Sequence, residues 1–372
     1  MKRAGNLYQQ VYSMENLRLA HKNASRGKGW YKEVQEINKN PDKYLYKIWK
    51  MLKNKTFHTS NYEMFEREEN GKIRKIYKLP YFPDRIVQWA LMQVIEPYLI
   101  KNFTKDTYSA IPGRGIHQAM KRLKKDLYND PEGCKYCLKI DIRHYYQCVN
   151  HDILKAKFRR LFKDPNLLWL IDEIIDSIST CEVEDLNQIW VGFEDVDEAT
   201  GIPIGNYLSQ YCGNFYLSSF DHYLKEELGV KHFYRYMDDM TIFGPSKEWL
   251  WDVFNKLELY LNVHCRVYLK PNWQLFPTYI RGVDFVGYRF FYDYILLRKT
   301  TCKNMKKQLV KMQKKCSKGQ LVNYSEYCSY NSYKGWTKHC DSHRLEKKYF
   351  NVLSKHIERY YNTVIKKGVK AT

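Results

Sequence analysis

Two adjacent aspartates, Asp238 and Asp239, interrupt an apolar run that extends from Phe233 to Phe243, and this pair restricts the local structure strongly. Aspartate is unfavourable inside a strand, so an acidic pair between two apolar strands is expected at the tip of a β-hairpin. Two neighbouring carboxylates repel each other unless a cation lies beside them, and a divalent metal ion would supply that charge. An ordinary polar turn is the alternative interpretation.

A third acid, Asp141, lies about a hundred residues upstream, at the end of a short apolar strand expected over 137–142. A buried carboxylate without a partner would be costly, so Asp141 is expected either to cap the next turn or to share a cation with the acidic pair. If the chain brings the three carboxylates together, they are able to hold two Mg²⁺ ions for phosphoryl transfer.

The charge of the chain indicates its partners. Lys and Arg number 62 against 41 Asp and Glu, which gives a net charge of +21, and 16% of the residues are aromatic. Cations beside aromatic rings suit nucleic acid, because phosphates pair with the cations while bases stack on the rings. A basic protein without such a partner is the alternative.

The apolar stretches and the cysteines of the sequence indicate where the protein is expected to be located. No stretch of eighteen or more apolar residues occurs, and the first residues lack an apolar signal core, so we expect neither a membrane span nor an export signal. The chain has ten cysteines, and only Cys134 and Cys137 form a CxxC pair. A zinc site needs four ligands, so free thiols in a reducing cytosol are the preferred interpretation.

Residue periodicity predicts a mixed α+β core followed by a helical, basic lobe after about residue 298. Residues 1–60 are expected to be helical, and 62–80 to form a hairpin that turns at Asn70-Gly71. A helix capped by Asp84 is expected to stop at Pro97, and residues 182–200 to form an acidic excursion. Further helices are expected at 116–128, 150–162, 165–180, 206–228, 246–262 and from 299, and strands at 232–236, 240–243, near 264–269 and, as a pair, over 282–291.

The string Tyr236-Met237-Asp238-Asp239 resembles the YxDD box of reverse transcriptases, and Asp141 stands where that family places its first metal-binding aspartate. The resemblance implies an RNA-directed DNA polymerase with a right-hand fold. It also implies two Mg²⁺ ions, replaceable by Mn²⁺, held by Asp141, Ile142, Asp238 and Asp239, with the three aspartates catalytic. The implied domains are an N-terminal helical extension (1–60), fingers (61–136), a palm with inserted helices (137–298) and a thumb (299–372).

The segment Gly201–Gln210 departs from the commoner reverse transcriptase motif, with Ile204 in place of a glutamine and Gln210 in place of a proline. This form resembles the reverse transcriptases of diversity-generating retroelements, which copy a template RNA with errors opposite adenine. Isoleucine packs but forms no hydrogen bond, so loss of a polar check would lower discrimination between right and wrong pairs. The alternative is that Ile204 is simply a buried loop residue.

The resemblance extends over nearly the whole chain and implies further roles. Tyr146 would exclude a ribose 2′-hydroxyl, and Lys270 lies near the place of a lysine that protonates the leaving group, although its spacing departs from the family pattern. The expected deoxynucleotide-binding residues are Lys72, Arg74, Tyr146, Ile204 and Gly205. The expected primer grip is Phe285, Gly287 and Tyr288, and the expected template contacts are Arg85, Arg114 and Gln210.

The expected partners are template RNA, the RNA/DNA duplex, deoxynucleotides and a small basic oligomeric accessory protein, which RNA or the acidic segment Glu182–Glu198 would attract. The expected location is the cytoplasm of a bacterium, with a bacterial or phage gene. One alternative is a reverse transcriptase of the retron or antiviral-defence type. Another is a catalytically silent module that only binds RNA.

Overall fold

A computed structural model describes residues 2–69, 71–180 and 199–366 of the chain. Its contacts divide the chain into two compact units. The first unit contains residues 1–115, 139–240 and 251–273, and the second contains 116–138, 241–250 and 274–372. The division runs through strands β3 (Tyr136–Asp141) and β5 (Asp239–Gly244), so each of these strands belongs to both units.

The first unit begins with four helices, and capping side chains mark the starts of two of them, α2 and α4. Ser13 accepts a hydrogen bond from the N–H of Asn16 at 3.2 Å, and Asn40 accepts one from the N–H of Lys43 at 3.3 Å. The helices are α1 (Tyr8–Val11), α2 (Met14–Ala24), α3 (Lys32–Lys39) and α4 (Pro41–Lys53). Helix α2 packs on α5 (Ile86–Asn102), where Asn16 donates a hydrogen bond to the carbonyl of Ala90 at 2.9 Å.

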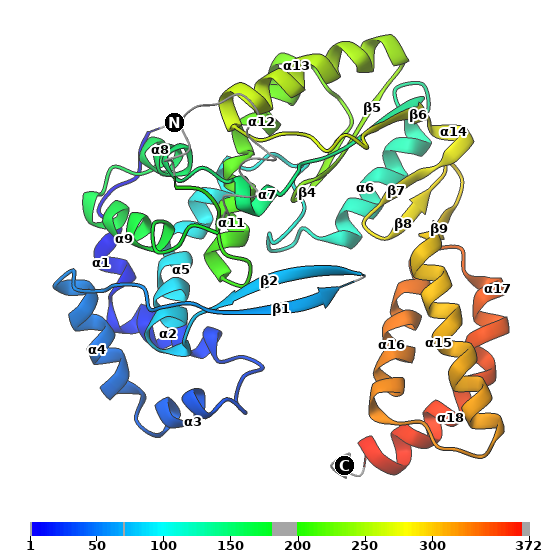
Figure 1. Cartoon of the computed structure of the whole chain (residues 1–372), viewed down its shortest axis with the longest axis horizontal. Helices are drawn as coiled ribbons and strands as arrows, with labels where there is room; N and C mark the ends of the chain where they lie inside the picture. The colour runs from blue at the N-terminus through cyan, green and yellow to red at the C-terminus, as the bar shows by residue number, and fades with distance from the viewer. Residues whose placement is uncertain (1, 70, 181–198, 367–372) are drawn as a thin grey trace. The chain divides into compact units, whose positions relative to one another are not determined.

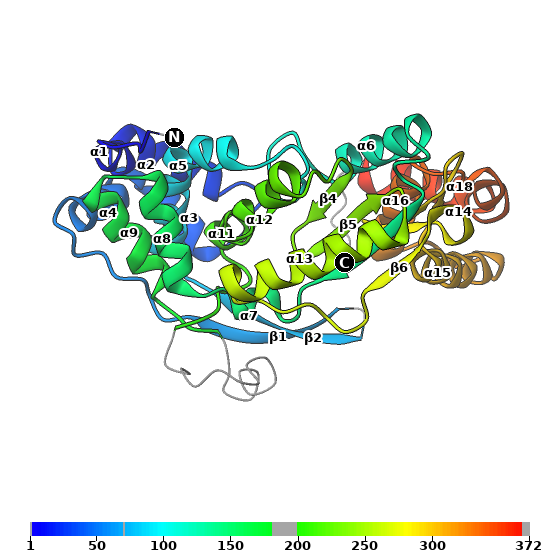
Figure 2. The ribbon, with the colours of Figure 1, turned by 90° about the horizontal axis from the view of Figure 1, so that it is seen from above.

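The expected hairpin in the first unit is confirmed. Strands β1 (Glu63–Glu69) and β2 (Lys72–Lys78) are antiparallel, with Phe65 opposite Ile76, and extend side by side in Figures 1 and 2. Of the expected turn, Asn70 lies outside the described residues.

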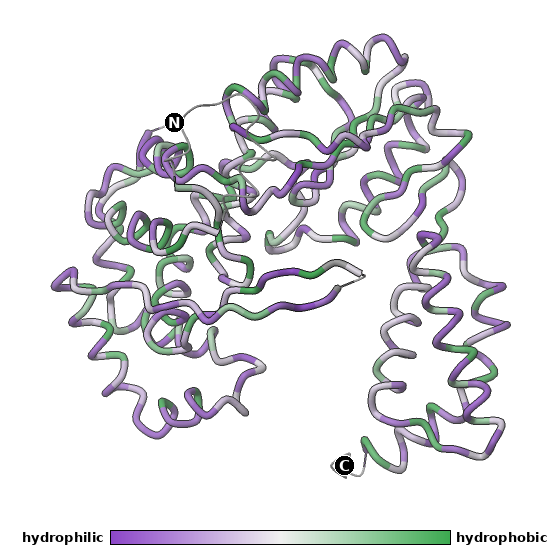
Figure 3. Tube along the Cα trace, in the orientation of Figure 1, coloured by the Kyte–Doolittle hydropathy of each residue, from purple (hydrophilic) through white to green (hydrophobic). Residues whose placement is uncertain are grey.

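The expected end of the next helix at Pro97 is wrong, because α5 continues through this residue to Asn102. Proline removes one main-chain hydrogen bond, and the burial of Ile95 and Leu99 on either side of it outweighs that loss. Figure 3 shows the hydrophobic character of this segment.

A second sheet has four strands in the order β4-β5-β3-β6. Strands β4 (Phe233–Tyr236) and β5 are the two arms of the expected acidic hairpin, and β6 spans Gln274–Pro277. The apolar residues of β4 and β5 are buried, as the sequence predicts. The other helices of this region are α6 (Ile116–Asn129), α7 (Tyr145–Cys148), α8 (His151–Leu161), α9 (Pro165–Ile175), α11 (Tyr207–Tyr216), α12 (Ser218–His222), α13 (Lys247–Cys265) and α14 (Thr278–Arg281).

Three expected elements of this region are corrected. The helix expected at 165–180 ends at Ile175, and the helix expected at 206–228 is divided at Leu217. The strand expected near 264–269 does not form, because α13 continues to Cys265 and only Leu269 then bridges to Ile142. Short π-helical segments occur at Tyr81–Arg85, Tyr223–Glu227, Glu346–Phe350 and Tyr361–Ile365.

The C-terminal part of the second unit contains a small antiparallel sheet and a set of helices. The strands are β7 (Val283–Phe285), β8 (Tyr288–Phe290) and β9 (Ile295–Leu297), so the expected strand pair is confirmed. The helices are α15 (Lys299–Ser317), α16 (Tyr324–Thr337), α17 (His343–Leu345) and α18 (Asn351–Tyr360). In α15, Met305, Leu309, Met312 and Cys316 are buried at helical spacing between lysines, and Figure 3 shows the mainly hydrophilic trace.

The mixed α+β class predicted from the sequence is confirmed. Nine cysteines of the described residues are free thiols, whereas Cys181 lies outside that part of the chain. The acidic segment Glu182–Glu198 also lies outside it. In the described ranges, no helix has both the length and the apolar character that crossing a bilayer requires.

Candidate active site

The acidic hairpin turns at Met237 and Asp238, between β4 and β5. Met237 has a positive φ of 57°, a conformation that a side chain disfavours and that its surroundings must hold. Arg235, which is fully buried, donates a hydrogen bond to the Met237 carbonyl at 3.2 Å. The same guanidinium pairs with buried Asp221 at 2.7 Å and bonds Asn214 at 3.2 Å, so the turn rests on a buried polar network.

Asp141 lies at the end of β3 and receives a hydrogen bond from Lys270 Nζ at 2.7 Å. The backbone fixes this contact, because the N–H of Lys270 donates to the Asp141 carbonyl and the N–H of Arg143 to the Tyr268 carbonyl, both at 2.8 Å. The second carboxylate oxygen of Asp141 is buried and has no hydrogen-bond partner in the part of the chain that the structure describes. Such an oxygen is well suited to act as a ligand of a cation.

Asp238 lies beside Asp141. Burial and the neighbouring Asp141 carboxylate raise the pKa of Asp238 to about 6, and Lys270 acts in the opposite direction. This is the behaviour of two acids that share one site.

The third carboxylate, that of Asp239, lies beside a lysine. The Asp239 carboxylate pairs with Lys139, which precedes Asp141 by two positions on β3 and therefore lies on the same face of that strand. Across residues 2–69, 71–180 and 199–366, no three His, Cys, Asp or Glu side chains form a group that would hold a metal ion. Lys139 therefore offsets the charge of Asp239.

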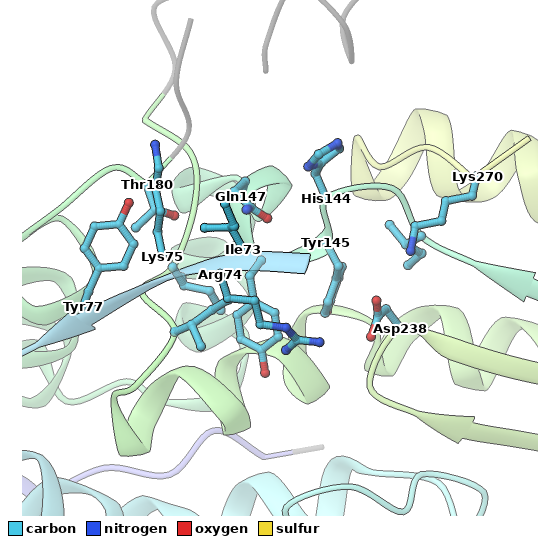
Figure 4. Close-up of a pocket in the computed structure, with 14 residues that line it drawn as sticks. Ile73, Arg74, Lys75, Tyr77, His144, Tyr145, Gln147, Thr180, Asp238 and Lys270 are labelled. Atoms are coloured by element: carbon cyan, nitrogen blue, oxygen red, sulfur yellow. The ribbon is translucent and has the colours of Figure 1, made fainter. Parts of the chain in front are cut away.

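A hollow of about 720 Å³ in the first unit is lined by Asp238, and Figure 4 shows its lining. Its size is within the range of pockets that hold whole small molecules, roughly 300–1,000 Å³. The guanidinium of Arg74, from β2, extends toward the Asp238 side of the hollow (Figure 4). The lining residues are Ile73, Arg74, Lys75, Tyr77, Ile142, His144, Tyr145, Tyr146, Gln147, Thr180, Ile202, Ile204, Asp238 and Lys270.

Tyr146 and Ile204 both line this hollow. The hydroxyl of Tyr146 contacts the sulfur of Met237 at 3.7 Å. Burial and the charge of Asp238 raise the pKa of this hydroxyl, so Tyr146 remains neutral at physiological pH.

The carbonyl of Ile204 accepts a hydrogen bond from the N–H of Tyr77 at 3.0 Å, which ties its loop to β2. Gly205 has a φ of 126°, and a Cβ there would lie 2.7 Å from the Tyr77 carbonyl oxygen. The close approach of β2 thus requires glycine at this position.

The three expected template contacts lie in the first unit, and each has a different environment there. Arg114 donates a hydrogen bond to the Thr104 carbonyl at 2.6 Å, and Gln210 is exposed on α11. Arg85 lines a separate hollow of about 200 Å³. The backbone of Lys72 belongs to β2, and its side chain lies outside the description.

The expected primer-grip residues lie in the second unit. Phe285 and Tyr288 are buried, and the Tyr288 hydroxyl donates to the Trp336 carbonyl at 3.0 Å. A Cβ on Gly287 would lie 2.3 Å from the Trp336 ring. The small size of Gly287 is therefore required by the Trp336 ring within this unit, whereas the sequence suggested close approach of a primer.

Sequence reasoning missed several residues of the site. Lys139 was not singled out, although its position two residues before Asp141 was an available signal. Lys75, His144, Gln147 and Thr180 also line the hollow. His144 has a positive φ of 44°, a conformation that is uncommon for residues other than glycine.

The family model described as reverse transcriptase (RNA-dependent DNA polymerase) matches residues 59–290. This match covers more than half of the chain, so the chain belongs to the reverse transcriptase family, and its fold is the right-hand polymerase fold of that family. Reverse transcriptases generally use divalent metal ions.

Among curated relatives, protein YkfC of Escherichia coli K12 is 27% identical over 238 residues, which are 63% of this chain and 53% of that protein. The group II intron-encoded protein LtrA of Lactococcus lactis subsp. cremoris is 22% identical over 179 residues, 48% of this chain and 28% of that protein. The chain thus spans about half of YkfC and less of LtrA. A solved apo telomerase from Candida tropicalis is 13% identical, with a TM-score of 0.48, over 84% of this chain and 60% of that chain.

Proposed function

We propose that this chain is an RNA-directed DNA polymerase, which extends a primer with deoxynucleotides along an RNA template. The observation that carries the proposal is that Asp238, with Asp141 as its neighbour, lines a nucleotide-sized hollow toward which Arg74 is directed. The two acids would bind metal ions, and the cationic group would bind the triphosphate that the metal ions accompany. A silent RNA-binding module would not require this arrangement.

The proposed metal ligands are Asp141, Asp238 and Asp239, with the backbone of Ile142 beside them. The unpartnered buried oxygen of Asp141 and the raised pKa of Asp238 support a cation at this place. Asp239 would join the site after exchanging Lys139 for a metal ion. Two bound Mg²⁺ ions, or Mn²⁺ in their place, would supply positive charge to the transferring phosphate and to the attacking hydroxyl.

The remaining roles in nucleotide binding follow from the lining of the hollow. Arg74 would pair with the triphosphate, with Lys72 and Lys75 on the same strand beside it. The neutral Tyr146 would occupy the space that a ribose 2′-hydroxyl needs. Lys270 would keep Asp141 oriented and supply a positive charge near the leaving group.

Contacts to the nucleic acid are proposed for both units. Arg85, Arg114 and Gln210 would contact the template. In the second unit, β7 and β8 would form the primer grip, with Phe285, Gly287 and Tyr288 maintaining its shape.

The finer assignment is a diversity-generating reverse transcriptase that makes errors opposite template adenine. It is supported by the sequence of the loop Gly201–Gln210 and by the position of Ile204 in the lining of the hollow, where its side chain offers only packing. The proposed partners are a small basic accessory protein and an RNA that both this chain and the accessory protein bind. A retron or defence-associated reverse transcriptase is the alternative, and Gln210 in place of the usual proline is the sequence feature against it.

Primer extension on an RNA template tests the proposal. The Asp238→Ala/Asp239→Ala variant should lose incorporation by at least about a thousandfold, as expected when groups that bind metal at a reacting phosphate are removed. Asp252→Ala/Glu248→Ala, on an exposed part of α13, is the matched control and should retain activity. Undiminished synthesis by the first variant would refute the site.

A further inference from the structure

A hollow of about 310 Å³ lies within the second unit, between the beginning of α6 and the segment that follows α16. Its lining is strongly cationic. His117, Lys121 and Lys124 come from α6, and Lys338 and His339 follow the end of α16. None of these five side chains forms a hydrogen bond or an ion pair with another described residue.

One carboxylate, that of Asp341, lines the hollow against three lysines and offsets only part of their charge. The carboxylate of Asp341 accepts the N–H of Ile295 at 2.8 Å and so is held at the start of β9. Glu346, which is near Cys340, accepts a hydrogen bond from Ser342 at 2.9 Å. Burial raises the pKa of the Cys340 thiol to about 12, with Asp341, Cys302 and Glu346 adding to the effect, so this thiol is neutral.

The two imidazole rings in the cluster contact each other. The ring centroids of His117 and His339 are 4.0 Å apart, at an interplanar angle of 37°. Burial and the positive charges of His117, Lys121 and Lys338 lower the pKa of His339. Two protonated imidazoles at this separation repel each other, and an anion between them would offset that repulsion.

The chemistry of the hollow selects its ligand. Unpaired ammonium and imidazole groups around one space suit a phosphate, which accepts several hydrogen bonds. A neighbouring hollow of about 340 Å³ shares His117, Lys338 and His339 and is also lined by Trp336. Trp336 stacks on Tyr288 with ring centroids 5.3 Å apart, so the cations adjoin an aromatic surface of the kind that nucleic acids contact.

We propose that the hollow formed by His117, Lys121, Lys338 and His339 binds a backbone phosphate of the nucleic acid and takes up protons from solvent as the phosphate enters. The proposal rests on the proposed function, because it assumes that an RNA/DNA duplex is the bound polymer. A phosphate beside the imidazoles favours their charged forms, so the pKa of His339 is higher in the complex than in the free protein. Affinity therefore increases as pH falls through the imidazole range.

The experiment measures the affinity for a fluorescein-labelled RNA/DNA hybrid by anisotropy from pH 5.5 to 8.0, at constant salt and with EDTA to prevent chemistry. The wild-type protein should bind about tenfold more tightly at pH 6 than at pH 8, the factor that corresponds to one pKa unit. His117→Gln/His339→Gln should bind at pH 6 as weakly as the wild type does at pH 8. His356→Gln, an exposed histidine on α18 in the same unit, is the control and should keep the wild-type pH dependence.

Circular dichroism melting curves check that the variants fold. If the double variant does not fold, the imidazole proton resonances of the wild type, followed by NMR while the hybrid is added, provide the second measurement. Resonances of His117 and His339 that move toward the protonated position support the proposal, and resonances that do not move overturn it.

Titration with inorganic phosphate distinguishes the two sources of the anion. Free phosphate could shift the imidazole resonances while the double variant keeps the pH-dependent affinity for the hybrid. That result would overturn the proposed site for a backbone phosphate and would indicate a site for a free anion. If incorporation is normal and the double variant keeps the pH dependence, only this inference fails. If the pH response requires both histidines and no deoxynucleotide is incorporated, only the proposed polymerase activity fails.

Discussion

The guanidinium of Arg235 donates a hydrogen bond to the main-chain carbonyl of Met237 at 3.2 Å, and thereby holds the turn that carries Asp238. The same side chain is fully buried with Asp221. A buried ion pair contributes less through attraction than its removal costs, because loss of one partner leaves the other charge buried and unpaired. The acidic turn is therefore coupled to the stability of the first unit.

Replacing Arg235 with Met should lower the free energy of unfolding by about 3–5 kcal/mol, because Asp221 is left without its partner. Arg235→Met/Asp221→Asn should recover part of this loss, since neither charge then remains buried. Urea unfolding measures both. Lys256→Met is the control: its pair with Asp252 is exposed, and the expected loss is below about 1 kcal/mol. Equal losses for Arg235 and Lys256 would contradict the account.

Gly205→Ala should disturb the hairpin formed by β1 and β2. An alanine Cβ would lie 2.7 Å from the Tyr77 carbonyl oxygen, and the φ of 126° is itself strained for alanine, so the expected cost is about 1–3 kcal/mol. Because Arg74 belongs to the displaced strand, the KM for deoxynucleotides should rise. Steady-state primer extension measures this effect. Gly29→Ala, where a Cβ meets nothing within 4 Å, should leave the KM unchanged.

The substitution Ile204→Gln tests the proposed low fidelity. A glutamine at the lining of the hollow would add a hydrogen-bonding group near the nascent pair, and one net hydrogen bond of about 0.5–1.5 kcal/mol corresponds to a two- to tenfold change in discrimination. Errors opposite template adenine should fall by about that factor, as measured by sequencing the cDNA. Ile204→Val keeps an apolar side chain and should keep the wild-type spectrum. An unchanged spectrum in the glutamine variant would remove the basis for the diversity-generating assignment.

Asp238→Asn should make the protein more stable in EDTA. The pKa of Asp238 is about 6 in the folded chain and about 3.9 in an unfolded one, so its ionisation opposes folding as pH rises from about 4 to 6. Asparagine lacks this penalty. The gain in melting temperature should therefore be full at pH 7.5 and smaller at pH 5. Asp252→Asn, an exposed acid on α13, should show no such gain. A lower melting temperature for Asp238→Asn would mean that the two acids do not oppose each other.

The acidic hairpin was predictable because its signal is local: two acids cannot interrupt an apolar run without a turn, and β4 and β5 form on either side of them. The pairing of Asp239 with Lys139 was not predictable in the same way. It depends on β5 lying next to β3 in the sheet, an order that no local pattern specifies.

Burial in the folded chain also overrides predictions that were made from the local sequence. Proline 97 was expected to end a helix, yet buried Ile95 and Leu99 keep that helix continuous. The contact between His117 and His339 joins segments more than two hundred positions apart, so neither histidine had a sequence signal. Glycine 287 was recognised as a necessary small residue, but the side chain that requires this size, Trp336, was identified only from the structure.

Binding of Mn²⁺, followed by electron paramagnetic resonance in the presence of a non-extendable primer, an RNA template and a deoxynucleotide, tests the role of Asp141 and Asp238 most directly. The account predicts that the wild-type protein binds two ions and that Asp141→Asn and Asp238→Asn each weaken binding by at least about tenfold, as when a charged ligand is lost from a cation site. Binding of Mn²⁺ with wild-type stoichiometry and affinity by both variants would contradict it.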